Sequence, residues 1–257
     1  MKNKYSYRHW QIFISLPLMA VATPGLAQEN WKGSIGAGAI YAPDYLGSDD
    51  YETQVWPALD LRYGERFYFN LRDGLGWNVI REGNWRVSPF IGYIQGRDDE
   101  DDLRHLDEVD GGATAGLRVV YLDDAWVYSA AAQTPFTGDV DGYQLDLEAR
   151  WHGRLAEQWS ASFGPSLTYS SEDWTQDIFG ISSSESARSG LAAYEPGDGY
   201  FRASLGGSLS YWLTPEWSIT GLAGVSQLTG DAEDSPIVDD IGDATQTYVG
   251  AFINYRF

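Results

Sequence analysis

The sequence has no cysteine and few histidines, three in 257 residues. Without cysteine the chain can form no disulfide framework, and an exported form could carry no lipid on an N-terminal cysteine. Its stability must therefore come from packing or from closing a sheet on itself.

Long apolar runs are also missing, because no stretch of 18 apolar residues exists to form a membrane-spanning helix. The apolar stretch at residues 12–22 is too short to cross a bilayer. It follows three basic residues and precedes small residues suited to cleavage after Ala27. The pattern predicts a secretory signal peptide over residues 1–27 and an exported domain over residues 28–257. A short anchor helix is the alternative.

Basic residues are scarce, 17 against 37 acidic ones. Removing the three basic residues of the signal peptide leaves 14 basic and 37 acidic residues, a formal net charge of −23. A chain with this charge repels nucleic acid, so nucleic acid is excluded as a partner.

Glycine and aromatic residues are abundant instead. The chain has 29 Gly, and aromatics make up 15% of it, with 11 Trp and 17 Tyr. Barrels in bacterial outer membranes carry aromatic girdles at both lipid interfaces. The composition therefore favours a protein of the bacterial outer membrane, surrounded by lipid and lipopolysaccharide.

Hydrophobicity alternates with a period of two along most of the exported domain. Residues 143–152 place apolar side chains at odd positions and charged or polar ones at even positions, with aromatics at both ends of the apolar side. Residues 159–169 and 201–211 repeat the pattern. A β-sandwich also alternates, but strands of about ten residues suit a tilted membrane crossing. The class predicted is all-β, an antiparallel up-and-down transmembrane β-barrel.

The connections set the number of strands. Short turns and long loops must alternate between the periplasmic and the extracellular end. They do so if residues 66–80 are split at Asp73-Gly74, a hairpin signal. This gives twelve strands with both termini in the periplasm; ten strands is the alternative. The long polar loops are at residues 44–51, 97–110, 137–141, 172–199 and 230–243.

The last residues read AFINYRF and place Ile253, Tyr255 and Phe257 on one face of the closing strand. No polar tail follows, which is expected if this strand pairs with residues 31–41 and closes the sheet. A terminal Phe with an aromatic two residues before it resembles the C-terminal signal of outer-membrane barrels, which the barrel insertion machinery reads.

No catalytic residue, cofactor or metal ligand is predicted. A serine hydrolase needs a base beside its nucleophile, yet neither His105 nor His152 is followed by a serine two residues on. Residues 97–110 hold eight carboxylates and residues 230–243 hold six, without the spacing of an EF-hand. These loops form either a solvated acidic surface or loose Ca²⁺ or Mg²⁺ bridges to lipopolysaccharide phosphates.

Charged residues on the polar faces of the strands are expected to point into the lumen. They line a pore that selects ions, or they form ion pairs that fill a narrow barrel. These candidate lumen charges are Asp60, Arg62, Arg72, Arg86, Arg118, Asp146, Glu148, Arg150, Arg202 and Arg256.

The segment GAGAIYAPDYLGSDDYETQVWPALDLRYGERFYF resembles the start of the MipA/OmpV family, and residues 189–199 and 228–238 resemble that family's late loops. The resemblance implies an outer-membrane barrel without enzymatic activity. It further implies a scaffold that brings a murein lytic transglycosylase together with a penicillin-binding protein. A small porin and an adhesin acting through residues 172–199 are the alternatives, and that loop could equally cover the barrel mouth as a plug.

Overall fold

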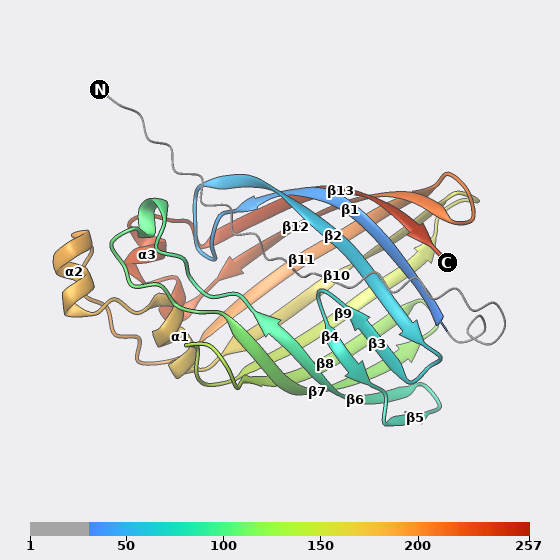
Figure 1. Cartoon of the computed structure of the whole chain (residues 1–257), viewed down its shortest axis with the longest axis horizontal. Helices are drawn as coiled ribbons and strands as arrows, with labels where there is room; N and C mark the ends of the chain where they lie inside the picture. Colours follow the sequence, from blue (N-terminus) through green and yellow to red (C-terminus); the bar gives the residue numbers. More distant parts are fainter. Residues whose placement is uncertain (1–30) are drawn as a thin grey trace, which may run out of the picture.

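The computed structural model describes residues 31–257, and the predicted signal peptide lies outside them. The strands form one antiparallel sheet that closes on itself, because β1 pairs with both β2 and β13 while β4 pairs with β6 (Figure 1). The predicted all-β barrel is confirmed.

The elements follow one another around the barrel in sequence order. The strands are β1 (Trp31–Pro43), β2 (Tyr51–Tyr63), β3 (Phe67–Asn70), β4 (Gly74–Trp77), β5 (Ile80–Glu82), β6 (Trp85–Ile94), β7 (Gly112–Asp123), β8 (Trp126–Pro135), β9 (Gln144–Arg154), β10 (Trp159–Ser170), β11 (Tyr200–Trp212), β12 (Trp217–Leu228) and β13 (Thr245–Arg256). The helices, all in loops, are η1 (Asp101–Leu103), α1 (Glu172–Phe179), α2 (Ser183–Ser189), η2 (Gly230–Ala232) and α3 (Pro236–Asp239).

The closed wall has twelve strands, as predicted, and β5 is a continuation of β4. Leu75 pairs with Ile91, whereas Ile80 pairs with Val87, so the β4–β5 side holds one residue more than β6 between these pairs. A single extra residue of this kind is a β-bulge. The Ser88 hydroxyl donates to Oδ1 of Asn78 at 2.6 Å and holds the bulge in place.

The predicted split at Asp73-Gly74 is present, but the two strands that it creates are only four residues long. Oδ1 of Asn70 accepts from the backbone N–H groups of Arg72 and Asp73 at 3.0 and 2.7 Å. Gly74 follows with a φ of +74°, a conformation that glycine adopts without strain. The hairpin therefore turns back well before the length needed to cross the membrane.

Aromatic pairs lie at both ends of the wall, as the composition predicts. Trp31–Tyr63, Trp85–Tyr121 and Trp217–Tyr255 have ring centroids about 5 Å apart at the end that carries the short turns. Tyr41–Tyr51 and Tyr169–Phe201 lie at the other end. Two such belts fit two membrane–water interfaces.

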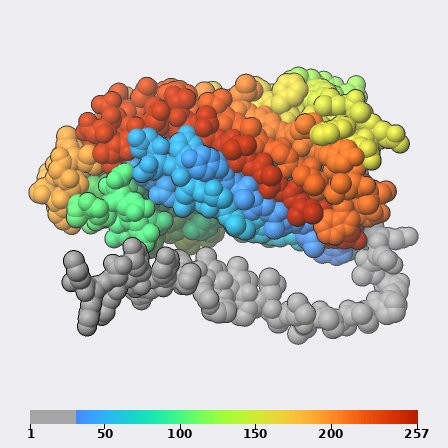
Figure 2. Space-filling model, turned by 90° about the horizontal axis from the view of Figure 1, so that it is seen from above, coloured from blue at the N-terminus to red at the C-terminus, as the bar shows by residue number. Residues whose placement is uncertain are grey.

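All long loops and their helices lie at one end of the barrel, and the C-terminus lies at the other (Figure 1). Among residues 31–257, no helix is long and apolar enough to cross a membrane. Figure 2 shows the blue N-terminal strands directly beside the red C-terminal strand. At this seam the N–H of Phe257 donates to the carbonyl of Gly33 at 3.0 Å, and the Gly33 N–H donates back at 3.2 Å.

The seam leads to a test of the predicted C-terminal signal. Replacing Phe257→Ala should lower the yield of folded barrel in the outer membrane several-fold, because it removes the terminal aromatic while leaving the pairing of β13 with β1 available. Folded and unfolded forms are separated by their different gel mobility before and after heating.

The matched control is Phe163→Ala. The side chains of Phe163 and Phe257 both face outward, and the two residues are 51% and 50% exposed. An equal loss in the two variants would mean that only general lipid-facing area matters, and that the terminal position has no special role.

Candidate functional site

The middle of the lumen is crossed by ion pairs centred on the short β3–β4 hairpin. Nη2 of Arg72 donates to Oε2 of Glu148 on β9 at 3.0 Å. The neighbouring Asp73 lies 3.3 Å from a guanidinium nitrogen of Arg118 on β7. Both partners are on strands that do not pair with the hairpin. The turn of the hairpin is thus tied to β7 and β9, which lie two and four strands along the sheet from β4.

Aromatic and charged side chains complete this crossing. Nη1 of Arg118 donates to the Tyr68 hydroxyl at 3.0 Å, and its guanidinium lies 4.6 Å from the ring centre of Phe90. Nε of Arg150 donates to Glu148 at 2.6 Å, so that carboxylate has two arginine partners. Ion pairs are thus present among the candidate lumen charges, and the choice between a filled lumen and an open lining stays a prediction.

The remaining candidate lumen charges have other surroundings. Asp60 and Arg62 pair with each other on β2 at 3.1 Å, and Asp146 accepts from the Thr168 hydroxyl at 2.7 Å. Two others lie at the periplasmic end. Arg86 donates to the carbonyl of Gly83. Arg256 donates to the carbonyl of Pro215, and its guanidinium lies 4.4 Å from the ring centre of Trp212. Arg202 lines a cavity at the outer end.

The loops at the outer end fold into a cap with its own apolar core. Trp174, Ile178 and Phe179 of α1 are 5%, 8% and 0% exposed and pack with Tyr200 and Leu228 at the strand ends. A second cluster joins Leu103, Leu106, Ile181 and Ile237 from three different loops. Residues 172–199 therefore cover the barrel mouth, and the apolar side chains that an adhesin would display are buried.

A buried ion pair joins two of these loops. Arg97 and Glu185 are both nearly buried, and a guanidinium nitrogen lies 3.4 Å from the carboxylate. Arg97 also donates to the carbonyls of Ile178 and Asp107 at 2.7 and 3.1 Å, while its Nε is buried without a partner. The side chain of Glu185 accepts from the backbone N–H of Asp107 and Ser182 at 2.9 and 2.7 Å.

The environment of Glu185 lowers its pKa. Burial acts to raise it, but hydrogen bonds from Ser182 and from the backbone of Asp107, together with the charge of Arg97, outweigh burial and hold the pKa of Glu185 below its ordinary value of 4.5. Glu185 also completes a capping box at the start of α2 with Ser182.

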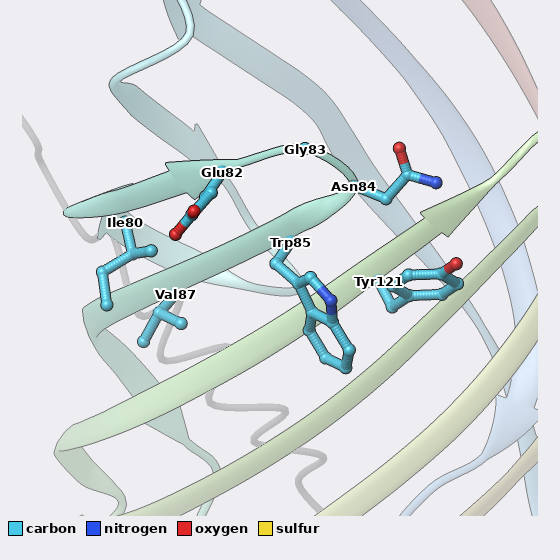
Figure 3. A pocket seen from close by; sticks show the side chains of 7 residues that line it. All are labelled: Ile80, Glu82, Gly83, Asn84, Trp85, Val87 and Tyr121. Atoms are coloured by element: carbon cyan, nitrogen blue, oxygen red, sulfur yellow. The ribbon is translucent and has the colours of Figure 1, made fainter.

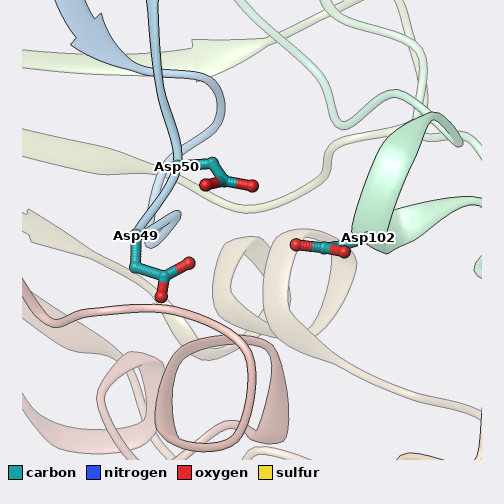
Figure 4. A group of neighbouring side chains, drawn as sticks. All are labelled: Asp49, Asp50 and Asp102. Atoms are coloured by element: carbon teal, nitrogen blue, oxygen red, sulfur yellow. The ribbon is translucent and has the colours of Figure 1, made fainter.

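Three carboxylates from two loops meet at the outer end of the barrel. Asp49 and Asp50 come from the β1–β2 loop and Asp102 from η1, and Figure 4 shows their side chains facing the same space. Their oxygens lie within 4.8 Å of one another, and all three residues are exposed. Only Asp102 belongs to one of the two acidic loops singled out in the sequence. Cation binding by those loops stays a prediction.

The two histidines within residues 31–257 lie at opposite ends of the barrel. His105 is in the outer β6–β7 loop, whereas His152 is near the periplasmic end of β9. His152 pairs in register with Ser162 of β10, a neighbour that the sequence alone did not suggest because the two are on different strands. The Ser162 hydroxyl hydrogen-bonds to that of Ser208 at 3.0 Å, a partner that is no general base.

Comparison with known proteins identifies the family. Residues 35–257 match the family model described as MltA-interacting protein MipA. This chain belongs to the MipA family. The MltA-interacting protein of Escherichia coli K12 is 30% identical over 240 residues, which cover 88% of this chain and 92% of that protein. The MipA resemblance seen in the turn and loop motifs is therefore confirmed.

A second relative of this MipA-family chain is the putative outer membrane protein YiaT of E. coli K12, 27% identical over 231 residues, 88% of this chain and 89% of that one. Among solved structures, the in-vitro folded trimer form of OmpT from Vibrio cholerae superposes with a TM-score of 0.40 at 8% identity, covering 89% of this chain and 98% of that chain. The family membership, the outer-membrane relative YiaT and the closed sheet described above make this MipA-family chain an outer-membrane barrel, as predicted.

The cap allows a first test at this site. Replacing Arg97→Met leaves Glu185 buried without its cation, so we expect the cap to open more easily by about 3–5 kcal/mol. Amide hydrogen exchange over α1 and α2 measures this opening. Because the pKa of Glu185 is lowered, its contribution is full above pH 4.5 and is lost as the pH falls through its folded pKa, so the protection factors of α1 and α2, corrected for intrinsic exchange at each pH, should fall in acid.

Arg188→Met is the control, because Arg188 and Asp107 form an exposed ion pair, with side chains 49% and 67% accessible, that contributes only about 0–1 kcal/mol. Similar exchange in both variants would contradict the role given to the buried pair.

The lumen allows a second test. In planar bilayers the unmodified barrel should show no stepwise conductance, because the cap covers one end and ion pairs cross the middle. Combining Arg72→Ser with Arg97→Met breaks the Arg72–Glu148 pair and makes the cap open more easily, and should produce discrete steps. In the control, Arg62→Ser replaces Arg72→Ser, since Arg62 pairs only within its own strand. Equal steps from the unmodified protein and the double variant would overturn this interpretation.

Proposed function

We propose that this barrel is a non-enzymatic scaffold that holds a murein lytic transglycosylase at the periplasmic face of the outer membrane. The observation that carries the proposal is its 30% identity, over 88% of the chain, to a protein named for interacting with MltA. A penicillin-binding protein as the second partner rests on the family resemblance alone.

The closed outer end supports a scaffold over a porin. The cap buries its apolar side chains over the barrel mouth, and the Arg72–Glu148 and Arg118–Asp73 pairs cross the lumen beneath it. A general porin needs a continuous aqueous path. The same cap buries Trp174, Ile178 and Phe179, which argues against adhesion through them.

The periplasmic rim is the surface that a murein enzyme can reach. The β5–β6 hairpin and the adjacent end of β7 surround a hollow of about 580 Å³, lined by side chains that include Glu82, Asn84, Trp85 and Tyr121 (Figure 3). The turn residues Glu82 and Asn84 supply a carboxylate and an amide, whereas Trp85 and Tyr121 belong to the inner aromatic belt, so the hollow lies at the membrane interface and its turn faces the periplasm. Because the rim turns are short, the contact area is small and we expect a dissociation constant in about the micromolar range.

The test uses the full barrel in lipid nanodiscs and a purified lytic transglycosylase from the same organism. Biolayer interferometry should detect binding, and Glu82→Lys should weaken it about tenfold, a loss of about 1.4 kcal/mol, by reversing a charge at the hollow. Glu157→Lys makes the same change on the β9–β10 turn and should have no effect.

Failure of the unmodified barrel to retain the enzyme would count directly against the scaffold role. Equal weakening by both substitutions would show that net charge, and not the hollow at the β5–β6 hairpin, controls the association.

A further inference from the structure

The outer half of the barrel wall is incomplete beside β2. Residues 60–63 of β2 pair with β3, but residues 51–59 pair only with β1 among the strands of residues 31–257. The gap exists because the β3–β4 hairpin turns back at residues 71–73. At about 3.3 Å per residue, these nine residues, which pair on one side only, leave a free edge about 30 Å long. Figure 1 shows β2 standing apart from β6 above this hairpin.

A cavity lies behind the free edge and reaches the outer surface of the wall. Its volume is about 910 Å³. Trp56 of β2 and Tyr200 of β11 line it from inside the barrel, and Tyr93 lines it as well. Yet Tyr93 occupies an outward position on β6 and is 71% exposed. Tyr93 lies beyond Ile91, the last residue of β6 that pairs with β4, so it stands at the same gap as the free edge of β2, and the cavity behind this gap has a lateral opening.

The lateral opening lies in the outer half of the membrane. Tyr41 and Tyr51, whose ring centroids are 5.3 Å apart, mark the outer aromatic belt at the ends of β1 and β2. The free edge runs from this belt toward the membrane centre. An exposed strand edge is unfavourable in hydrocarbon unless it lines a hydrated cavity or is covered.

The free edge is unsuited to pairing with another strand. Pro57 lies within it and has no N–H to donate, which is why proline occurs on sheet edges and blocks strand addition. Inward from the edge, Gln54 donates to Glu52, and the indole of Trp56 donates to Gln54 at 2.9 Å. This polar row faces the cavity, so the edge lines an opening.

The cavity lining combines aromatic surface with strong negative charge. Its lining includes the aromatic residues Trp56, Trp174 and Tyr200, seven carboxylates and one basic residue, Arg202. The burial of Asp44 and the nearby carboxylates of Glu52, Asp101 and Asp98 raise the pKa of Asp44 to about 6. Uncompensated negative charge beside aromatic rings favours an organic cation, which both groups attract.

We propose that the cavity binds a single-chain cationic amphiphile that enters from the outer half of the membrane through the lateral opening. The ammonium group lies among Asp44, Glu52 and Asp101, and the alkyl chain passes out beside Tyr93 into lipid. The volume suits a ligand of this size, since small-molecule sites span about 300–1,000 Å³. An anionic headgroup would be repelled by the same carboxylates.

The experiment uses the full barrel in nanodiscs with dodecyltrimethylammonium, below its critical micelle concentration, and subtracts binding to empty nanodiscs. Calorimetry should show saturable binding of one molecule per barrel. Tetramethylammonium, which lacks the chain, and dodecyl sulfate, which has the opposite charge, should each bind at least about tenfold more weakly. Equal binding of tetramethylammonium would overturn the lateral route, and displacement by equimolar Mg²⁺ would show a metal site instead.

The matched variants separate the cavity from general surface charge. Asp44→Asn combined with Glu52→Gln should weaken dodecyltrimethylammonium binding about tenfold, and Glu52→Gln alone should give part of this effect if the double variant does not fold. Glu233→Gln combined with Asp234→Asn removes two exposed carboxylates outside the cavity and should leave binding unchanged. Equal losses in the two double variants, or no saturable binding to the unmodified barrel, would contradict the proposal.

Discussion

Backbone hydrogen bonding is the constraint on which the rest of this structure depends. In lipid no water is available to the N–H and C=O groups of a strand, so a sheet must close on itself. The chain meets this requirement at the seam, where β13 pairs with β1 and where Phe257 and Gly33 exchange hydrogen bonds, but not along residues 51–59 of β2, which have one neighbouring strand. Side chains then follow from the alternation of strand faces, apolar to lipid and polar to the lumen.

The apolar core that a soluble protein would place inside its sheet is found outside the membrane here. The buried clusters around Phe179 and Ile237 belong to the cap, where loops meet water. The hydrophobic effect needs water on one side, which the cap has and the lipid-facing wall does not. The wall is therefore stabilised by pairing, while the cap is stabilised by packing and by the Arg97–Glu185 pair.

One short hairpin connects the lumen, the wall and the functional proposals. By turning back at residues 71–73 it brings Arg72 and Asp73 into the lumen, and it leaves residues 51–59 of β2 without a second neighbour. The cap lies over the outer end of the barrel, and ion pairs lie in its lumen. The periplasmic rim and the lateral opening are therefore the surfaces left for partners. The proposed scaffold contact and the proposed amphiphile site use these two separate surfaces.

Local patterns were enough to predict the strand number and the faces. Alternation over residues 143–152 and the Asp73-Gly74 turn signal depend on neighbouring residues alone, so they are visible in the sequence. The length of β3 and β4 is not visible in the sequence. The hairpin is held by the pairs Arg72–Glu148 and Asp73–Arg118, whose members are 76 and 45 residues apart along the chain.

Register was also beyond the sequence. The bulge at Asn78 depends on a hydrogen bond from Ser88, and the neighbourhood of His152 and Ser162 depends on how β9 aligns with β10. For the same reason the acidic loops could be identified by composition, while the cavity that joins Asp44 and Glu52 to Asp98 and Asp101 required their relative positions.

The central claim is that the sheet is closed where β1 meets β13 and is open beside residues 51–59 of β2. Amide hydrogen exchange of the barrel in lipid nanodiscs tests it most directly, by comparing β1 with residues 51–59. Strand β1 is paired on both sides and should stay protected, whereas residues 51–59, paired on one side, should exchange markedly faster. Equal protection of the two segments would mean that the wall is complete in the membrane, and fast exchange of β1 would mean that the seam with β13 is not closed.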